Sequence, residues 1–204
     1  MKHLLLFLFG MGLFVACDNA PQDATADNGA QTPTPIVEPT KPSDYVALIK
    51  ADYAASADKI DAYTRTEAEF EPQGGGGSGK FIRYSEGETL RMLREEIYDN
   101  HGPITTEYYF RTEGELYFVY EYSELQENAV RGATYVTEDR YYLNKGVCLQ
   151  HLNKRNKFAY GQNLDMGKVR SEEIEMDPNE LGEELRAQVD EVLARSRTAF
   201  GEAD

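Results

Sequence analysis

Apolar and polar residues alternate with a period of two through most of the segment 80–157, which is the pattern of half-buried β-strands. Turn residues divide this segment, above all Asn100-His101-Gly102-Pro103. The expected strands are 81–85, 104–111, 116–122, 134–143 and 147–152. Segment 89–98 fits a strand or a helix, because Leu90, Leu93 and Ile97 also follow helical spacing. The basic segment 153–157 is expected to end the sheet.

Helical spacing flanks the alternating segment on both sides. Val46, Ile49 and Tyr53 begin an apolar stripe that predicts a helix from about Tyr45, capped by Ser43 or Asp44 and ending between 61 and 66. Asp177-Pro178-Asn179-Glu180 is a strong helix start. The apolar stripe of this second helix consists of Leu181, Leu185, Val189, Val192, Leu193 and Phe200.

These elements predict one α+β domain over residues 43–204. Successive hairpins with short turns favour an antiparallel meander. The N-terminal and the C-terminal amphipathic helix are expected to pack together on one face of the sheet. Segment 67–71 alternates and is a further candidate strand. The run Gly74-Gly75-Gly76-Gly77-Ser78-Gly79 resembles an engineered linker or a natural flexible loop, and its spacing does not match a phosphate-binding loop.

The first residues form a separate hydrophobic segment. Lys2 precedes an apolar run from Leu4 to Val15, broken only by two glycines. This run is shorter than the about 20 apolar residues that cross a bilayer, and it has the length of a signal-peptide core. The sequence Leu13-Phe14-Val15-Ala16-Cys17 resembles the signal of a bacterial lipoprotein precursor, with Phe14 where leucine is more usual.

The resemblance implies cleavage between Ala16 and Cys17 and lipidation of the Cys17 sulfur, so that residues 1–16 are the signal. Residues 17–42 are then a lipidated cysteine and a disordered Pro/Thr-rich tether, because they offer almost nothing to bury. An ordinary secretory signal and an uncleaved anchor are the alternatives. The expected partner is a lipid bilayer through acylated Cys17, and the expected location is the bacterial cell envelope, with the outer membrane favoured in a Gram-negative cell.

The helix, tyrosine-rich sheet and closing helix also make the chain similar to small exported lipoproteins of Bacteroidota-type bacteria. That resemblance implies an envelope location and no active site.

Charge and cysteine content narrow the function further. The formal net charge is −15, which excludes a nucleic-acid partner held by phosphate neutralisation. With Cys17 lipidated, Cys148 is the lone thiol, and its strand-like surroundings predict a buried, unreactive side chain.

No residue pattern indicates catalysis, a cofactor or a metal. His101 and His151 are isolated, whereas a zinc site takes three or four convergent ligands. The neighbouring carboxylates Glu95-Glu96 and Glu138-Asp139 are expected to point to opposite faces of their strands. We therefore expect no catalytic, cofactor-binding or metal-binding residues.

Tyrosine is the most informative internal feature, since ten of fourteen lie between Tyr84 and Tyr142. Alternation places Leu116, Phe118, Tyr120 and Tyr122 on one face, with Tyr117, Val119 and Glu121 on the other. In the preceding strand, Tyr108 and Phe110 oppose Tyr109. Aromatic residues favour strands, so these side chains form either a core or an exposed platform. The candidate partner-binding aromatics are Tyr109, Tyr117, Tyr120, Tyr122 and Tyr142.

The sequence thus favours a membrane-anchored lipoprotein whose domain is a non-catalytic binding module for a protein or glycan. An accessory or inhibitor subunit of an envelope assembly is an alternative, and so is a hydrolase whose site forms only in three dimensions.

Overall fold

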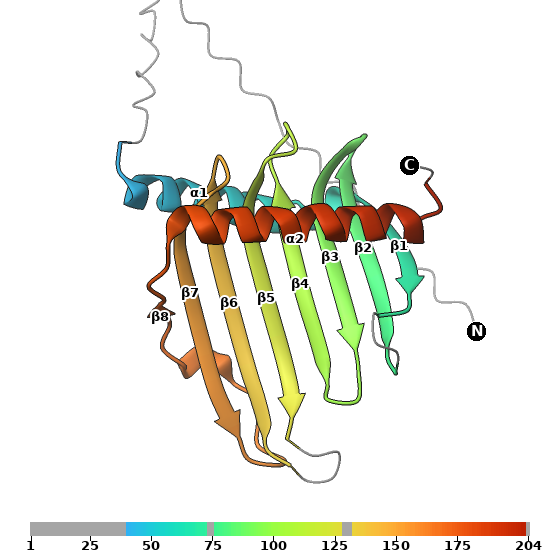
Figure 1. The fold of residues 1–204 in the computed structure, drawn as a ribbon, viewed down its shortest axis with the longest axis vertical. Coiled ribbons are helices and arrows are strands. Elements are labelled where there is room, and N and C mark those ends of the chain that lie inside the picture. The colour runs from blue at the N-terminus through green and yellow to red at the C-terminus, as the bar shows by residue number, and fades with distance from the viewer. Residues whose placement is uncertain (1–39, 73–75, 128–131, 203–204) are drawn as a thin grey trace, which may run out of the picture. The chain divides into compact units, whose positions relative to one another are not determined.

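Eight antiparallel strands form a single sheet in which the strand order follows the chain order (Figure 1). The computed structural model describes residues 40–72, 76–127 and 132–202. The predicted signal, Cys17 and the predicted tether up to residue 39 lie outside the described residues. The elements are α1 (Pro42–Asp58), a 3-10 turn (Ile60–Ala62), β1 (Thr64–Phe70), β2 (Ser78–Glu86), β3 (Thr89–Tyr98), β4 (Pro103–Phe110), β5 (Leu116–Gln126), β6 (Thr134–Asn144), β7 (Val147–Phe158), a 3-10 turn (Met166–Lys168), β8 (Glu172–Glu173) and α2 (Pro178–Ala199). The α+β class and the antiparallel meander are confirmed.

The two helices begin in different ways. In α2 the Asp177 side chain accepts hydrogen bonds from the backbone N–H groups of Asn179 and Glu180, at 2.9 and 3.1 Å, and Pro178 occupies the first turn. The predicted start of α2 is therefore confirmed. α1 begins at Pro42, and its N-cap, Lys41, makes no capping bond through its side chain. The expected cap by Ser43 or Asp44 is wrong, because the fixed φ of Pro42 starts the helix before either residue.

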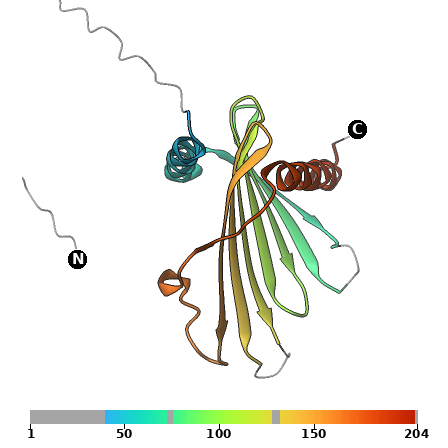
Figure 2. The same ribbon diagram turned by 60° about the vertical axis from the view of Figure 1, so that its left-hand side comes forward.

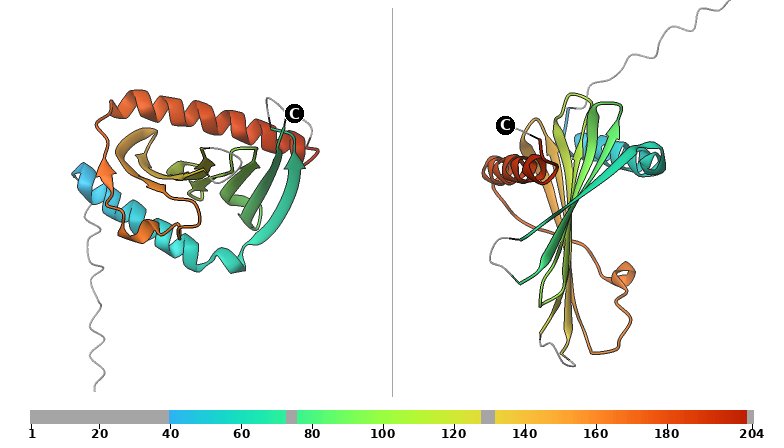
Figure 3. Two further views of the ribbon diagram at one scale, coloured as in Figure 1. Left: turned by 90° about the horizontal axis from the view of Figure 1, so that it is seen from below. Right: turned by 90° about the vertical axis from the view of Figure 1, so that its right-hand side faces the viewer.

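The helices lie on opposite faces of the sheet (Figures 2 and 3). Val46 and Ile49 of α1 join a cluster with Tyr84, Met92, Tyr109, Phe118 and Tyr142, which we call the α1 face. Leu185, Val189 and Val192 of α2 join a cluster with Phe81, Leu93, Tyr108, Val119 and Leu143, which we call the α2 face. This arrangement differs from the expected packing of both helices on one face. Large apolar side chains lie on both faces of the sheet, so each face needs a helix to shield these side chains from water.

A β-bulge changes the side-chain alternation in β5. Tyr109 pairs with Phe118, whereas Phe110 pairs with Leu116, so Tyr117 is an extra residue on its strand. Tyr117 therefore shares the α1 face with Phe118, and Leu116 joins the α2 face. The expected alternation holds from Phe118 onward but is wrong at these two positions.

Strands β5 and β7 are longer than the sequence predicts. β7 continues through the basic segment 153–157, and Phe158 at its end is buried with Val136 and Met166 in a third cluster. The expectation that this segment ends the sheet is wrong, because Phe158 and its partners extend the core. Segment 89–98, for which the sequence allowed a strand or a helix, is the strand β3, which pairs with β2 and β4. As a result, the sheet extends beyond both helices (Figure 1).

Candidate functional site

Three of the five candidate aromatics are core residues beneath α1. Tyr109, Tyr117 and Tyr142 are 4%, 2% and 4% exposed. Tyr109 packs edge-on against Tyr53 of α1, with ring centres 5.2 Å apart. These three side chains therefore contribute to stability and do not offer an open platform to a partner.

Tyr120 and Tyr122 are partly exposed. Tyr122 donates a hydrogen bond to Glu124 Oε1 at 2.6 Å and packs against the cluster around Val136. Tyr120 packs against the α1-face cluster, and it lines a cavity. Of the five predicted aromatics, Tyr120 and the buried Tyr142 meet at this cavity.

The cavity, which we call the tyrosine pocket, has a volume of about 370 Å³. Its lining residues come in pairs from three elements: Lys50 and Tyr53 from α1, Phe118 and Tyr120 from β5, and Arg140 and Tyr142 from β6. The pairs follow from local geometry, because i,i+3 positions share a helix face and i,i+2 positions share a strand face. Register places Phe118 opposite Tyr142 and Tyr120 opposite Arg140. The four sheet residues, Phe118, Tyr120, Arg140 and Tyr142, therefore form a compact patch next to Lys50 and Tyr53 of α1.

The pocket combines aromatic rings with positive charge. Lys50 Nζ lies 5.2 Å from the centre of the Tyr142 ring. Arg140 forms an ion pair with Glu138, and Lys154 Nζ lies 3.6 Å from the same Glu138 carboxylate. Burial raises the pKa of Tyr120 well above its usual range, and the nearby Glu138 carboxylate raises that pKa further. Burial likewise raises the pKa of Tyr53. Both phenols therefore stay protonated at neutral pH and can donate hydrogen bonds.

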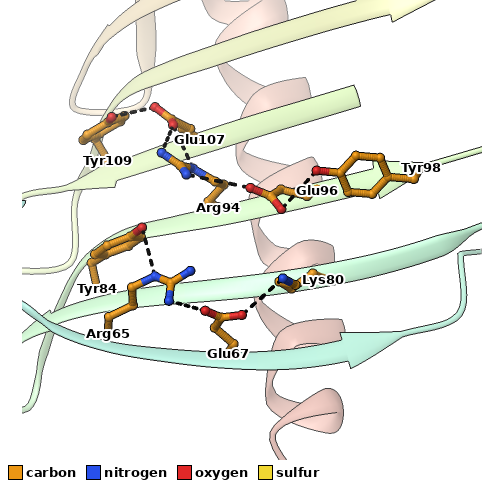
Figure 4. Close-up of polar contacts among 9 residues, drawn as sticks. All are labelled: Arg65, Glu67, Lys80, Tyr84, Arg94, Glu96, Tyr98, Glu107 and Tyr109. Atoms are coloured by element: carbon orange, nitrogen blue, oxygen red, sulfur yellow. Dashed lines mark hydrogen bonds and ion pairs between the residues drawn. The ribbon is translucent and has the colours of Figure 1, made fainter. Parts of the chain in front are cut away.

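A polar surface extends from the pocket along the α1 face of the sheet (Figure 4). Arg94 donates to Glu107, with Nη2 2.6 Å from Oε1, and Tyr109 donates to the second oxygen of the same carboxylate at 2.6 Å. Nearer the β1 edge, Lys80 Nζ lies 3.2 Å from Glu67 Oε2, and Arg65 pairs with the other oxygen of the same carboxylate. The carboxylates of Glu67 and Glu107 on this surface are therefore already bound by cations.

A second cavity, of about 250 Å³, lies on the other side of α1. Its lining includes Asp52, Lys59, Arg91, Arg111 and Tyr117. Arg111 Nη2 lies 3.2 Å from Asp52 Oδ2, and Arg91 Nη1 donates to Thr112 Oγ1 at 2.9 Å. This cavity is smaller, and both of its arginines already have partners.

The α2 face holds a cluster that the residue patterns did not indicate. His151 Nε2 lies 2.7 Å from Asp139 Oδ1, and its ring stacks on Tyr141 at 4.3 Å. Glu121, opposite Asp139 in register, accepts hydrogen bonds from Tyr141 and from Gln188 of α2. Burial raises the pKa of Glu121, with the Asp139 charge adding to it. The hairpin registers could have revealed this cluster, whose side chains connect β5, β6 and β7 with α2.

The remaining candidates for chemistry are separated by the fold. Glu95 and Glu96 lie on opposite faces, as predicted: Glu95 pairs with Arg195 of α2 at 2.6 Å, and Glu96 lies 3.7 Å from Arg94. Cys148 is a fully buried free thiol, as predicted, and burial raises its pKa to about 11. Within residues 40–72, 76–127 and 132–202, no three His, Cys, Asp or Glu side chains are arranged to hold a metal ion.

No protein-family model matches the chain, and neither the curated proteins nor the solved structures that were searched include a match. None of the helices in the described part of the chain has both the length and the apolar composition that crossing a membrane requires.

Proposed function

We propose that the protein is a lipid-anchored lipoprotein of the bacterial envelope and that its domain is a non-catalytic module that binds a glycan in the tyrosine pocket. The anchor is Cys17, and its support is the sequence Leu13-Phe14-Val15-Ala16-Cys17. The observation that carries the binding role is the pocket between α1 and strands β5 and β6.

The pocket suits a sugar ring in size and chemistry. Its volume of about 370 Å³ lies within the range of small-molecule sites, about 300–1,000 Å³. A sugar ring has apolar C–H faces and a polar edge of hydroxyl groups. Tyr53 and Tyr120 offer rigid rings with hydroxyl donors, and Arg140 adds a planar set of N–H donors. The glycan is therefore the partner class that uses all of these groups together.

The lining of the pocket favours binding over catalysis. Its six residues are lysine, arginine, three tyrosines and phenylalanine, so none is a carboxylate, histidine, serine or cysteine. General acid–base catalysis most often uses histidine or a carboxylate of suitable pKa. Two carboxylates near the lining residues, Glu138 and Glu107, are buried and already bound by cations.

Glycan binding is tested with the purified full-length lipoprotein in detergent, screened against a glycan array. The Tyr120→Ala variant should lose about tenfold or more in affinity for the selected glycan. The Tyr120 ring packs against the sugar and its hydroxyl donates a hydrogen bond, and the loss of both contacts should cost more than about 1 kcal/mol. Tyr160→Ala is the matched control, since Tyr160 is 68% exposed and lies outside the pocket. Equal binding by both variants would contradict the proposal. A protein partner captured only when Tyr120 is intact would favour the protein-binding alternative.

The anchor is tested separately. The Cys17→Ala variant should lose the mass of its lipid and should no longer partition with membranes, because the thiol accepts the lipid chains. If Cys17→Ala still associates with membranes and its lipid mass is unchanged, the proposed anchor is wrong. The proposal of glycan binding does not depend on this result.

A further inference from the structure

We infer that the sugar bound by the tyrosine pocket is acidic, a uronic-acid residue whose carboxylate meets Lys50 and Arg140. This inference rests on the proposed function and specifies its substrate class. It comes from the charges around the pocket, which oppose the charge of the chain as a whole. The chain has a net charge of −15, yet the pocket lining contains two cations and no acid.

Lys50 supplies one positive charge without a carboxylate partner among the described residues. It takes part in none of the ion pairs found there. Its neighbours at i±3 and i±4 on α1 are Val46, Ala47, Tyr53 and Ala54, so no acid lies next to it on the helix. The Lys50 ammonium instead lies over the Tyr142 ring at the pocket, where it can meet an anion.

Arg140 and Lys154 supply a second surplus charge because they share one carboxylate. Glu138 is 7% exposed and pairs with both cations. The other buried acid on this part of the sheet, Glu107, is bound by Arg94 and by the Tyr109 hydroxyl. Asp52 of α1 pairs with Arg111 on the other side of the helix. Each of these acids therefore has its own cation, and the charge facing the pocket is positive.

The arrangement of these groups fits a uronic acid better than a neutral sugar. A guanidinium group binds a carboxylate through parallel N–H···O bonds, and an ammonium group adds a charge-assisted bond. Tyr53 and Tyr120 can hold the ring by its apolar face while Lys50 and Arg140 hold the carboxylate. A neutral sugar would cover Lys50 and the surplus charge of the Arg140–Lys154–Glu138 group without supplying an anion, at a cost in free energy.

The test measures binding of uronic-acid oligosaccharides to the full-length lipoprotein in detergent by calorimetry. The probes are oligomers of galacturonate, of mannuronate and guluronate, and of glucuronate with N-acetylglucosamine, each beside its carboxyl-reduced neutral form. We expect at least one acidic oligomer to bind about tenfold more tightly than its reduced form, since hydrogen bonds to charged groups are worth about 1.5–3 kcal/mol. Binding should weaken as salt increases.

The matched variants are Lys50→Gln and Lys168→Gln, which each remove one exposed lysine. Lys50→Gln should weaken binding of the acidic oligomer about threefold to tenfold, a larger factor than for the reduced form, which has no carboxylate to lose. Lys168→Gln should change neither, because Lys168 lies in the 3-10 turn Met166–Lys168 and outside the pocket lining. Because both lysines are exposed, neither change should prevent folding.

The outcomes separate this inference from the proposed function. If no acidic oligomer binds better than its reduced form, or if Lys50→Gln and Lys168→Gln behave alike, the inference is wrong. The proposed function then stands when a neutral glycan binds and Tyr120→Ala weakens that binding. If Tyr120→Ala affects no glycan, both proposals are overturned.

Discussion

The hydroxyl groups of Ser56 and Tyr117 lie 3.1 Å apart in the buried contact between α1 and β5. Ser56 is near the end of α1, and Tyr117 is the extra residue of the β5 bulge. This hydrogen bond joins residues 61 positions apart and fixes one end of α1 against the sheet. Because the tyrosine pocket has two lining residues on α1, the bond also helps to position the site.

Tyr117→Phe should lower the free energy of unfolding by about 1–2 kcal/mol, because it leaves the buried Ser56 hydroxyl without this partner. The double variant Ser56→Ala/Tyr117→Phe should lose less than the sum of the two single variants, as expected for two groups in direct contact. Denaturant unfolding measures all three. The bond contributes nothing if the two single losses in unfolding free energy add up to that of the double variant, or if Tyr117→Phe is as stable as wild type.

Gly182→Ala tests the contact between α2 and the turn joining β6 and β7. A methyl group at Gly182 would lie 2.1 Å from the Gly146 carbonyl oxygen. Alanine in place of glycine normally favours a helix by about 1 kcal/mol. Here we expect the opposite sign, a loss of about 1–3 kcal/mol, because the helix must move away from the turn. The neighbouring exposed residue gives the control Glu183→Ala, which should stay close to wild type in thermal unfolding.

Local signals in the sequence predicted the elements well. Asp177, Pro178 and Glu180 carry the start of α2 within four residues, so no distant contact was needed to place it. The hairpin of β6 and β7 follows equally from the turn at Lys145 and Gly146, in which Gly146 has a φ of 77°. By contrast, the spacing in segment 89–98 fits both a strand and a helix, and only its pairing with β2 and β4 shows that it is a strand.

The faces and the site depend on distant contacts that spacing does not reveal. Alternation predicted that Tyr108 and Tyr109 lie on opposite faces, but it did not reveal that Tyr108 packs under α2 and Tyr109 under α1. Tyr117 and Leu116 exchange faces because of a bulge whose position depends on pairing with β4. The tyrosine pocket needs Lys50 and Arg140, which are on α1 and β6 and meet only in the fold. Sequence could name Tyr120 as a candidate, but it could not supply the cations.

Thiol labelling tests the burial of Cys148. Because burial raises its pKa to about 11, little thiolate forms at pH 8, and the fully buried sulfur is also closed to reagents. Alkylation by iodoacetamide in the native protein should be roughly a hundredfold or more slower than in denaturant. Peptide mass spectrometry distinguishes Cys148 from Cys17. Rapid labelling of Cys148 in the native state would contradict the buried position.

Glu121→Gln should change how stability depends on pH. Burial, reinforced by the Asp139 charge, raises the pKa of Glu121 above its ordinary value near 4.5. A carboxyl group whose pKa is higher in the folded state contributes stability below its unfolded pKa, and that contribution is lost as pH rises through the folded pKa. Glutamine never ionises, its amide oxygen can still accept from Gln188, and its amide N–H can donate to the Tyr141 hydroxyl oxygen. The variant should therefore gain stability relative to wild type as pH rises from about 4 to 7.

Thermal unfolding at several pH values between 4 and 7 measures this difference. Glu184→Gln is the control, because Glu184 is exposed on α2 and its replacement changes the net charge by the same unit. A Glu121→Gln curve parallel to wild type would show that the carboxylate is not destabilised by its surroundings. A curve that falls below wild type with rising pH would mean that the ionised Glu121 is the stabilising form. The Tyr141, Gln188 and His151 side chains would then stabilise it, and the sign of the pKa shift would be reversed.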